Sequence, residues 1–280
     1  LPHVSATFEP APETPLSYSP PAVLEHVPSV KQLLETQNSH ERLVEELVLP
    51  ELQAARVQIE YTFDPLLSQE VETILEQAQA QYAHILVSDP KTGRLLAYAS
   101  TDREKFSPAQ VYPAASLVKV VTTAAAMRHA PDALQRECRY QGSPYRLTPN
   151  RVDPPTRGSE VSFQKALGMS NNQCFAQLAV HAVGADALIA TIREFGLLDA
   201  PALGHAAGKI SFSSMPMDAP MKLPARDQEE DPEDDTAEDR YELGELGSGL
   251  SGLRITPLHA VQLAATLSDG MMREPYWIAK

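Results

Sequence analysis

The stretch Ser116–Ala130 reads SLVKVVTTAAAMRHA and predicts a buried α-helix that ends before Pro131. Valine and alanine dominate it, and Lys119 is the exception near its start. A lysine on such a helix either extends its amine to solvent or loses its water shell. Desolvation lowers the pKa of a lysine towards that of a usable base.

Ser116 and Lys119 are three residues apart, so their side chains share one face of the helix. Ser116 also lies at the helix N-terminus, where unpaired N–H groups stabilise a developing anion. A lysine with a lowered pKa can activate a serine as a nucleophile without histidine. The alternative is structural: Ser116 is a helix cap and Lys119 is a solvated lysine of the first turn.

Ser170-Asn171-Asn172 lies between two predicted helices, residues 162–169 and 174–183, and another helix is predicted over 186–195. Serine and asparagine are common helix caps, which is the structural interpretation of this triplet. In the functional interpretation, the Ser170 hydroxyl relays a proton and the Asn172 carboxamide holds a peptide-like amide.

The segment GSGLSG, from Gly247 to Gly252, matches the G-x-G-x-x-G pattern of dinucleotide-binding proteins. That function needs a hydrophobic strand before the glycines, and here an acidic stretch precedes them. The following helix is predicted to begin only at Thr256-Pro257.

The histidines lack metal-binding spacing, and the acidic run 229–235 lacks the glycine of a calcium loop. We therefore predict no cofactor and no metal.

The flanking patterns mix helix and strand. Two strands, 84–87 and 94–99, are predicted to form a hairpin through the turn Asp89–Gly93. Before it, a strand is predicted over 56–63 and a helix over 66–82. Residues 1–25 are proline-rich and predict an extended linker, and residues 30–52 show a helical pattern. With helices clustered in the middle, the order favours an α+β fold, or a sheet with a helical subdomain.

Charge and cysteine content exclude some functions. The net charge of −14 argues against a nucleic-acid partner. Much of the excess negative charge lies within residues 226–240, where a mobile loop is predicted.

Cys138 and Cys174 cannot form a disulfide framework or a four-ligand zinc site. One disulfide and two buried thiols both remain open, and we favour the thiols.

Several segments, in the same order along the chain, resemble penicillin-binding protein transpeptidase domains of the β-lactamase-like superfamily. They are VQIEYTFDPLLSQEVETIL (57–75), DPKTGRLLAYAS (89–100), VYPAASLVKVVTTAAA (111–126), SEVSFQKALGMSNNQCFAQLAVHAVG (159–184), FGLLDAPALGHAAGKI (195–210) and GSGLSGLRITPLHAVQLAATLSDGMMREP (247–275). The resemblance covers residues 55–280, which we expect to form the transpeptidase domain, and leaves 1–54 as a linker or arm with a short helix.

The resemblance implies roles for individual residues through the family's S-x-x-K and S-x-N motifs. Ser116 becomes the acylated nucleophile, Lys119 its base, Ser170 a proton relay and Asn172 a holder of the substrate amide. Gly247 and Gly249 fall in the segment similar to the family's substrate-binding G-x-G stretch. The implied reaction is D,D-transpeptidation of peptidoglycan stem peptides, inhibited by β-lactams, outside the cytoplasmic membrane in a membrane-anchored precursor.

One motif of the family is not found in its usual order. Its K-[ST]-G strand follows the T-P-L helix, and this sequence reaches Lys280 first. Lys91-Thr92-Gly93 spells K-T-G but precedes the serine, so we assign it to a turn. We therefore expect an antiparallel sheet that lacks its C-terminal strands, and weak penicillin labelling of this piece alone. Three explanations stay open: a second chain or fragment completes the domain, the sequence is truncated, or the precursor is cleaved elsewhere. Two alternative functions remain: a β-lactamase or β-lactam sensor, and a catalytically silent scaffold that binds a partner.

Overall fold

The computed structural model describes residues 44–49, 55–102, 105–106, 110–199 and 236–277, and they belong to two compact units. The first unit comprises Leu1–Tyr112, Asp199–Ala207 and Thr256–Lys280, and the second comprises Pro113–Leu198 and Gly208–Ile255. The predicted proline-rich linker, residues 1–25, lies outside the described residues. So does most of the predicted acidic loop.

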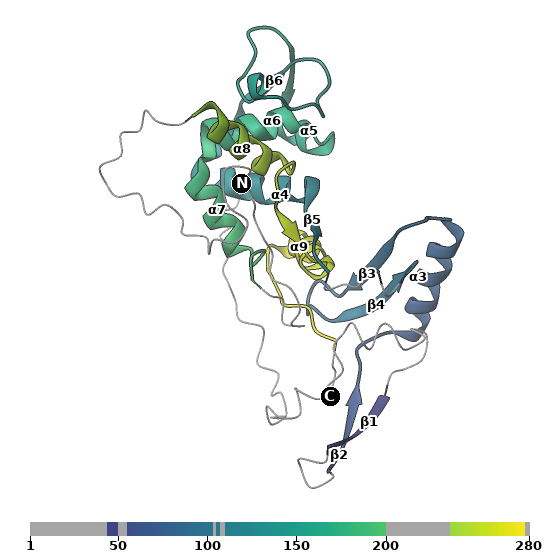
Figure 1. The fold of residues 1–280 in the computed structure, drawn as a ribbon. Helices are drawn as coiled ribbons and strands as arrows, with labels where there is room; N and C mark the ends of the chain where they lie inside the picture. Colours follow the sequence, from purple (N-terminus) through teal and green to yellow (C-terminus); the bar gives the residue numbers. More distant parts are fainter. Residues whose placement is uncertain (1–43, 50–54, 103–104, 107–109, 200–235, 278–280) are drawn as a thin grey trace. The chain divides into compact units, whose positions relative to one another are not determined.

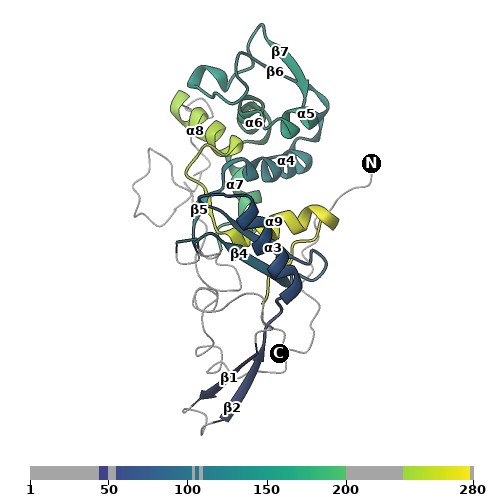
Figure 2. The same cartoon turned by 90° about the vertical axis from the view of Figure 1, so that its right-hand side faces the viewer.

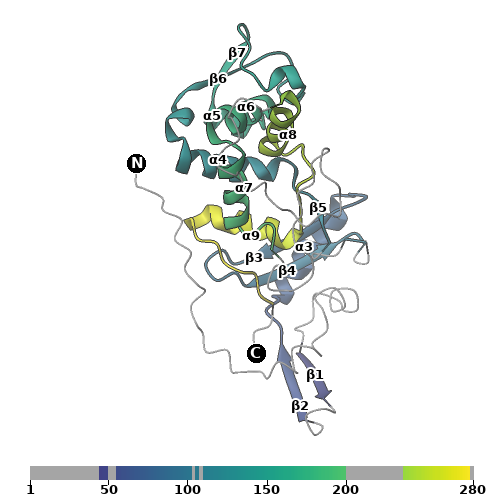
Figure 3. The ribbon, with the colours of Figure 1, turned by 60° about the vertical axis from the view of Figure 1, so that its left-hand side comes forward.

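Two antiparallel strands, β1 (Val44–Leu49) and β2 (Ala55–Glu60), are the first described elements of unit 1 (Figure 3). Strand β2 confirms the predicted strand 56–63 as far as Glu60. The helix predicted over 30–52 is wrong for Val44–Leu49. Six backbone partners on β2, from Val44↔Glu60 to Leu49↔Ala55, pair with that segment, and such pairing outweighs a local helical pattern.

Unit 1 also contains a helix packed on a hairpin. Helix α3 (Pro65–Gln77) starts with Asp64 as its N-cap, and β3 (His84–Ser88) pairs with β4 (Leu95–Ser100) in antiparallel register. Buried side chains of α3 and β4 form one apolar cluster: Val71, Leu75, Ala97 and Ala99. Figure 2 shows α3 lying along this hairpin. The predicted helix 66–82 is thus confirmed in position, although it ends at Gln77.

The turn between β3 and β4 contains Lys91-Thr92-Gly93, as the sequence predicted. The Asp89 carboxylate accepts hydrogen bonds from Lys91 N and Thr92 Oγ1. Gly93 has φ +80, and a Cβ there would lie 2.4 Å from the Glu274 carbonyl oxygen. These three residues therefore form a hairpin turn, and Tyr276 pairs in parallel with Arg94 at its end.

The described part of unit 2 is mainly helical, and α4 (Val118–His129) is its central helix. Helices α6, α7 and α8 and the π-helical turn η5 all pack against α4 (Figure 1). The elements are η2 (Ala115–Leu117), η3 (Pro131–Gln135), η4 (Pro149–Arg151), α5 (Phe163–Gly168), α6 (Asn172–Leu178), η5 (Ala179–Val183), α7 (Ala185–Glu194) and α8 (Ala237–Ser248), with β6 (Glu137–Tyr140) antiparallel to β7 (Ser159–Ser162). The helices predicted over 116–130, 162–169, 174–183 and 186–195 are all present.

Helix α8 corrects part of the predicted acidic loop. Residues 226–235 lie outside the described residues, but Ala237–Ser248 is helical. Thr236 and Asp239 form a capping box, in which each side chain accepts a hydrogen bond from the other residue's backbone N–H. The carboxylates of this first turn also face the positive end of the helix, so the acidic residues here stabilise a helix start.

Helix α9 (Pro257–Asp269) begins where the sequence predicted, with Thr256 as N-cap and Pro257 as its first residue. Two further short strands are β5 (Tyr112–Pro113) and β8 (Arg254–Ile255). Among the described residues no single helix has the length and apolarity to cross a membrane. One bent pair, Asn172–Val183 with Ala185–Glu194, passes that test only when joined. The α+β class with antiparallel strands is confirmed.

Candidate active site

Ser116 and Lys119 meet at the start of α4. Ser116 lies in the 3-10 turn η2, and Lys119 follows in the first turn of α4. Lys119 Nζ is 2.9 Å from Ser116 Oγ. The lysine is 1% exposed, whereas Ser116 is exposed. The two structural alternatives are therefore wrong: Ser116 makes no capping bond in η2, and Lys119 does not reach solvent.

The Ser-Asn-Asn triplet brings two more side chains to the same point. Ser170 Oγ lies 2.8 Å from Ser116 Oγ and 3.2 Å from Lys119 Nζ. Asn172 Oδ1 accepts a hydrogen bond from Lys119 Nζ at 2.8 Å. Asn171 is the residue that caps α6, through its side-chain bond to the N–H of Cys174. The capping and functional interpretations thus apply to different residues of one turn.

The backbone is strained at two positions of this site. Among the described residues, three that are not glycine have positive φ, and two of them are Ala115 (φ 47) and Ser170 (φ 55). Left-handed conformations cost an L-residue on the order of 1–2 kcal/mol. Such strain clusters at functional sites, where surrounding structure holds it in place. Here the two residues are Ser170 itself and the residue before Ser116, and the two serine hydroxyls lie 2.8 Å apart.

The loop 141–145 fixes the start of α6 through its carbonyl groups. Pro144 O accepts from the backbone N–H of Asn172, and Tyr145 O accepts from Asn172 Nδ2 at 2.7 Å. The Gln173 side chain bonds the backbone of Gln141 and Ser143. The first turn of α6 is therefore held from outside the helix, which fixes the Asn172 carboxamide.

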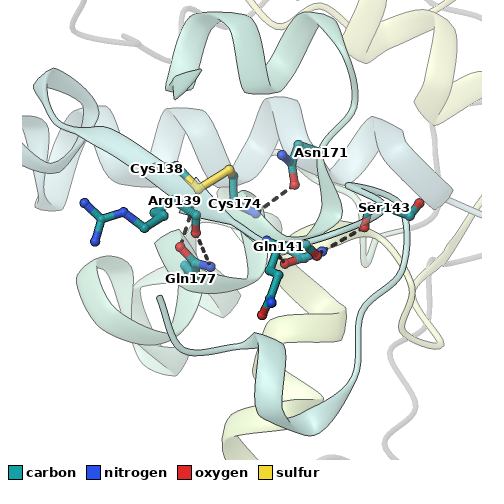
Figure 4. Close-up of a disulfide and its surroundings, with 8 residues drawn as sticks. Cys138, Arg139, Gln141, Ser143, Asn171, Cys174 and Gln177 are labelled. Carbon is teal, nitrogen blue, oxygen red and sulfur yellow. Dashed lines mark hydrogen bonds between the residues drawn. A yellow bond between two sulfur atoms is a disulfide. The ribbon is translucent and has the colours of Figure 1, made fainter. Parts of the chain in front are cut away.

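A disulfide between Cys138 and Cys174 joins β6 to α6 beside this turn (Figure 4). The expectation of two buried thiols is wrong. The bond links residues 36 apart in the sequence. In the chain-entropy model, closing a loop of that length in the unfolded chain stabilises the folded protein by roughly 4 kcal/mol. Gln177, one turn further along α6, donates to Arg139 O and so reinforces the same connection.

Burial changes the acidity of Lys119. Desolvation lowers the pKa of its amine from 10.5 to about 8. At pH 7 about a tenth of the amine is then neutral, roughly three hundred times the fraction of an ordinary lysine. The Phe175 ring, whose centroid is 6.0 Å from Nζ, forms part of the apolar surroundings. Lys119 is therefore suited to accept a proton from a neighbouring hydroxyl.

The C-terminal end of α8 closes the other side of the site. Ser248 O accepts a hydrogen bond from Lys119 Nζ at 2.8 Å. Gly247 allows α8 to approach the neighbouring helix, because a Cβ on it would lie 2.3 Å from Ala179 Cβ. Gly249 (φ +81) ends α8, and its Cβ would lie 2.0 Å from Ala115 O. The glycines thus have packing roles, and their assignment to substrate binding stays a prediction.

Sequence reasoning missed Ser248 and Thr122. Thr122 lies one turn after Lys119 and is fully buried, and its hydroxyl donates to Gly247 O at 2.8 Å. The only sequence signal was a polar residue within an apolar helix. Its partner lies 125 positions away and could not be read from local patterns.

The arrangement joins an exposed hydroxyl, a buried amine with a lowered pKa and a second hydroxyl in contact with both. In chemical terms, the amine can deprotonate the exposed Ser116, and Ser170 can pass that proton onward. The site therefore has the parts of a serine acyl-transfer centre that needs no histidine.

Comparison with known proteins agrees with this chemistry. Residues 83–280 match the family model of the penicillin-binding protein transpeptidase domain. Among solved structures, penicillin-binding protein A of Mycobacterium tuberculosis has a TM-score of 0.58 at 23% identity, over 82% of this chain and 57% of that one. PBP2 of Pseudomonas aeruginosa, solved with WCK 5153, has a TM-score of 0.59 at 23% identity, over 79% and 54%.

The mycobacterial protein has also been solved as a penicillin G acyl-enzyme complex, with a TM-score of 0.56 at 24% identity, over 79% of this chain and 54% of that one. At these identities the likeness establishes the fold. The chain spans little more than half the length of these structural relatives. No curated protein sequence matches it.

Proposed function

Because this chain belongs to the family of penicillin-binding protein transpeptidase domains, we propose that it carries the acyl-transfer site of a peptidoglycan D,D-transpeptidase. The observation that carries the proposal is the position of Lys119 Nζ, 1% exposed and 2.9 Å from the exposed Ser116 hydroxyl. The substrates are stem peptides ending in D-Ala–D-Ala, and β-lactams inhibit the enzyme by acylating the same serine.

In the first half-reaction the neutral Lys119 amine takes the proton of Ser116 Oγ and becomes an ammonium. The serine oxygen forms a bond to the carbonyl carbon of the D-Ala–D-Ala peptide. Ser170, which contacts both groups, delivers a proton to the leaving nitrogen as the C–N bond breaks. An acyl-enzyme ester and free D-alanine result.

In the second half-reaction the amine of another stem attacks the ester. Its proton passes to the lysine, the C–O bond breaks, and Ser116 recovers its hydroxyl. Asn172 Nδ2 donates one hydrogen to Tyr145 O, and an amide nitrogen has two. We assign the second hydrogen to a carbonyl of the bound stem peptide, which would orient it against Ser116.

The Ser116 N–H, at the start of the helix, is the proposed first donor to the oxyanion. A Cβ on Gly249 would lie 3.1 Å from this nitrogen, so the glycine keeps the approach to it open. We propose that the second donor and the contact to the substrate carboxylate come from the family's K-[ST]-G motif. Lys91–Gly93 does not take that role here, because its side chains and backbone form the β3–β4 turn.

We further propose that the protein works outside the cytoplasmic membrane, as a periplasmic domain with a membrane anchor. Its substrate is a cell-wall polymer, and its Cys138–Cys174 disulfide is typical of an oxidising compartment.

The test compares transfer with hydrolysis in the full-length protein that contains this chain. One sample of the protein is incubated with a fluorescent penicillin, and a separate, untreated sample with a D-Ala–D-Ala stem peptide and an acceptor amine, and the products of each are identified by mass spectrometry. Ser116→Ala serves as the blank. We expect a label that persists for many turnover times and an exchanged stem peptide. Rapid hydrolytic release of the label would indicate a β-lactamase, and a full-length protein that takes no label would contradict the enzyme proposal.

A further inference from the structure

Four oxygen atoms surround the Lys119 amine, and they are of two kinds. Asn172 Oδ1 and Ser248 O, each 2.8 Å from Nζ, can only accept hydrogen bonds. The hydroxyls of Ser116 and Ser170, at 2.9 and 3.2 Å, can donate or accept. A neutral amine has two hydrogens and one lone pair. When the two hydrogens go to the two obligatory acceptors, the lone pair faces the hydroxyls.

The Ser248 carbonyl is available because of where it lies. It belongs to the last residue of α8, and the last carbonyls of a helix have no partner within the helix. An unpaired buried carbonyl is costly, so its bond with the amine also satisfies the helix end. The amine orientation therefore depends on the exact position of this last turn of α8.

Thr122 holds that turn. Its Oγ1 is 2.8 Å from Gly247 O, the carbonyl immediately before Ser248, and 3.2 Å from Val118 O of its own helix. A hydroxyl has one hydrogen, and the shorter contact is the one across to α8. Thr122 is fully buried and lies one turn beyond Lys119, so α4 supplies both the amine and the group that positions the amine's acceptor.

We infer that Thr122 is a positioning residue: its hydroxyl fixes the Gly247–Ser248 peptide, so that Ser248 O and Asn172 Oδ1 together aim the lone pair of Lys119 at Ser116. The inference rests on the proposed function of Lys119 as the base. It assigns a role to a side chain that never touches the substrate.

No charged group among the described residues competes with this arrangement. None of their ion pairs includes Lys119, and its four hydrogen-bond partners are all neutral. The titratable and charged side chains of α4 and of the elements packed against it are Arg128 and His129 on α4, Asp132 on η3, His181 on η5, Asp186, Arg193 and Glu194 on α7, and Glu238, Asp239, Arg240, Tyr241, Glu242 and Glu245 on α8. Desolvation therefore lowers the pKa of Lys119, and the two acceptors determine where the lone pair of its amine points.

The test measures the acylation rate by a fluorescent penicillin as a function of pH in the full-length protein. Thr122→Val keeps the shape of the side chain and removes the hydroxyl. We expect the high-pH plateau to fall about tenfold, the effect of about one lost hydrogen bond. We also expect the midpoint of the rising limb to move to lower pH, because a lost carbonyl acceptor disfavours the ammonium.

Two comparisons separate positioning from stability. Thr122→Ser should keep the wild-type midpoint, and Thr122→Ala should behave as Thr122→Val. The serine and alanine variants differ by the hydroxyl alone, so they provide the test if the valine variant does not fold. Thr191→Val is the matched control, since Thr191 is a buried helical threonine whose hydroxyl bonds only Ala187 O of its own helix. It should leave plateau and midpoint unchanged.

A Thr122→Val protein with the wild-type plateau and midpoint would overturn the inference. A midpoint that moves to higher pH would also overturn it, since Ser248 O would then not have favoured the ammonium. If the wild-type protein itself takes no label, the proposed function fails instead, so the two failures are distinct.

Discussion

Lys119→Met should reduce the rate at which β-lactams acylate Ser116 by about a thousandfold. Methionine has nearly the length of lysine but no basic nitrogen, so the Ser116 hydroxyl loses its proton acceptor. General-base groups typically contribute 10² to 10⁴ in rate. The expected loss lies within this range because Ser170, the other group in contact with Ser116, is itself a hydroxyl and a poor base. Stopped-flow measurement with a chromogenic β-lactam gives the rate.

Lys165→Met provides the control, because Lys165 is an exposed lysine on α5. It should acylate at the wild-type rate. A Lys119→Met protein that acylates within tenfold of wild type would mean that another group deprotonates Ser116, and the assigned base would be wrong.

Gly249→Ala should destabilise the protein by about 3 kcal/mol and lower the acylation rate about a hundredfold. The left-handed backbone (φ +81) costs any other L-residue about 1–2 kcal/mol. Its Cβ would also lie 2.0 Å from Ala115 O, and overpacking of this kind costs about 1–3 kcal/mol. Backbone must move to relieve the overlap, and the backbone concerned carries Ser116. Displacements of about 1 Å in an active site can cost 10² in rate.

Gly168→Ala is the matched substitution, since a Cβ at Gly168 meets no atom within 4 Å and Gly168 has no positive φ. Chemical unfolding and the acylation rate are measured for both variants. If Gly249→Ala kept the wild-type stability and acylation rate, the close contact between Gly249 at the end of α8 and Ala115 in η2 would be wrong.

The sequence predicted the elements whose signals are local. The apolar run after Ser116, the Thr256-Pro257 helix start and the Asp89–Gly93 turn each depend on residues a few positions apart, and all three are confirmed. The positions of Ser116 and Lys119 on one face followed from helix geometry alone. Their closeness to Ser170, more than fifty positions away, was expected only through the family resemblance.

The errors have two causes. Cys138–Cys174 and Thr122 with Gly247 are pairings between segments distant in the sequence, which no local pattern reports. Strand β1, which pairs with the next strand along the chain, and the start of α8 were missed because a local pattern was misinterpreted. High charge density suggested a loop over 226–240, although Thr236 followed three positions later by Asp239 is a capping signal.

The central claim is that the neutral form of the buried Lys119 amine, made more abundant by its lowered pKa, removes the proton from Ser116. The measurement that tests it most directly is the acylation rate of the wild-type, full-length protein by a β-lactam between pH 5 and 11. Only the neutral amine accepts a proton, so the rate should be low at acidic pH, rise with a midpoint near pH 8 and then reach a plateau. A rate that does not change with pH, or that rises only near the ordinary lysine pKa of 10.5, would contradict the account.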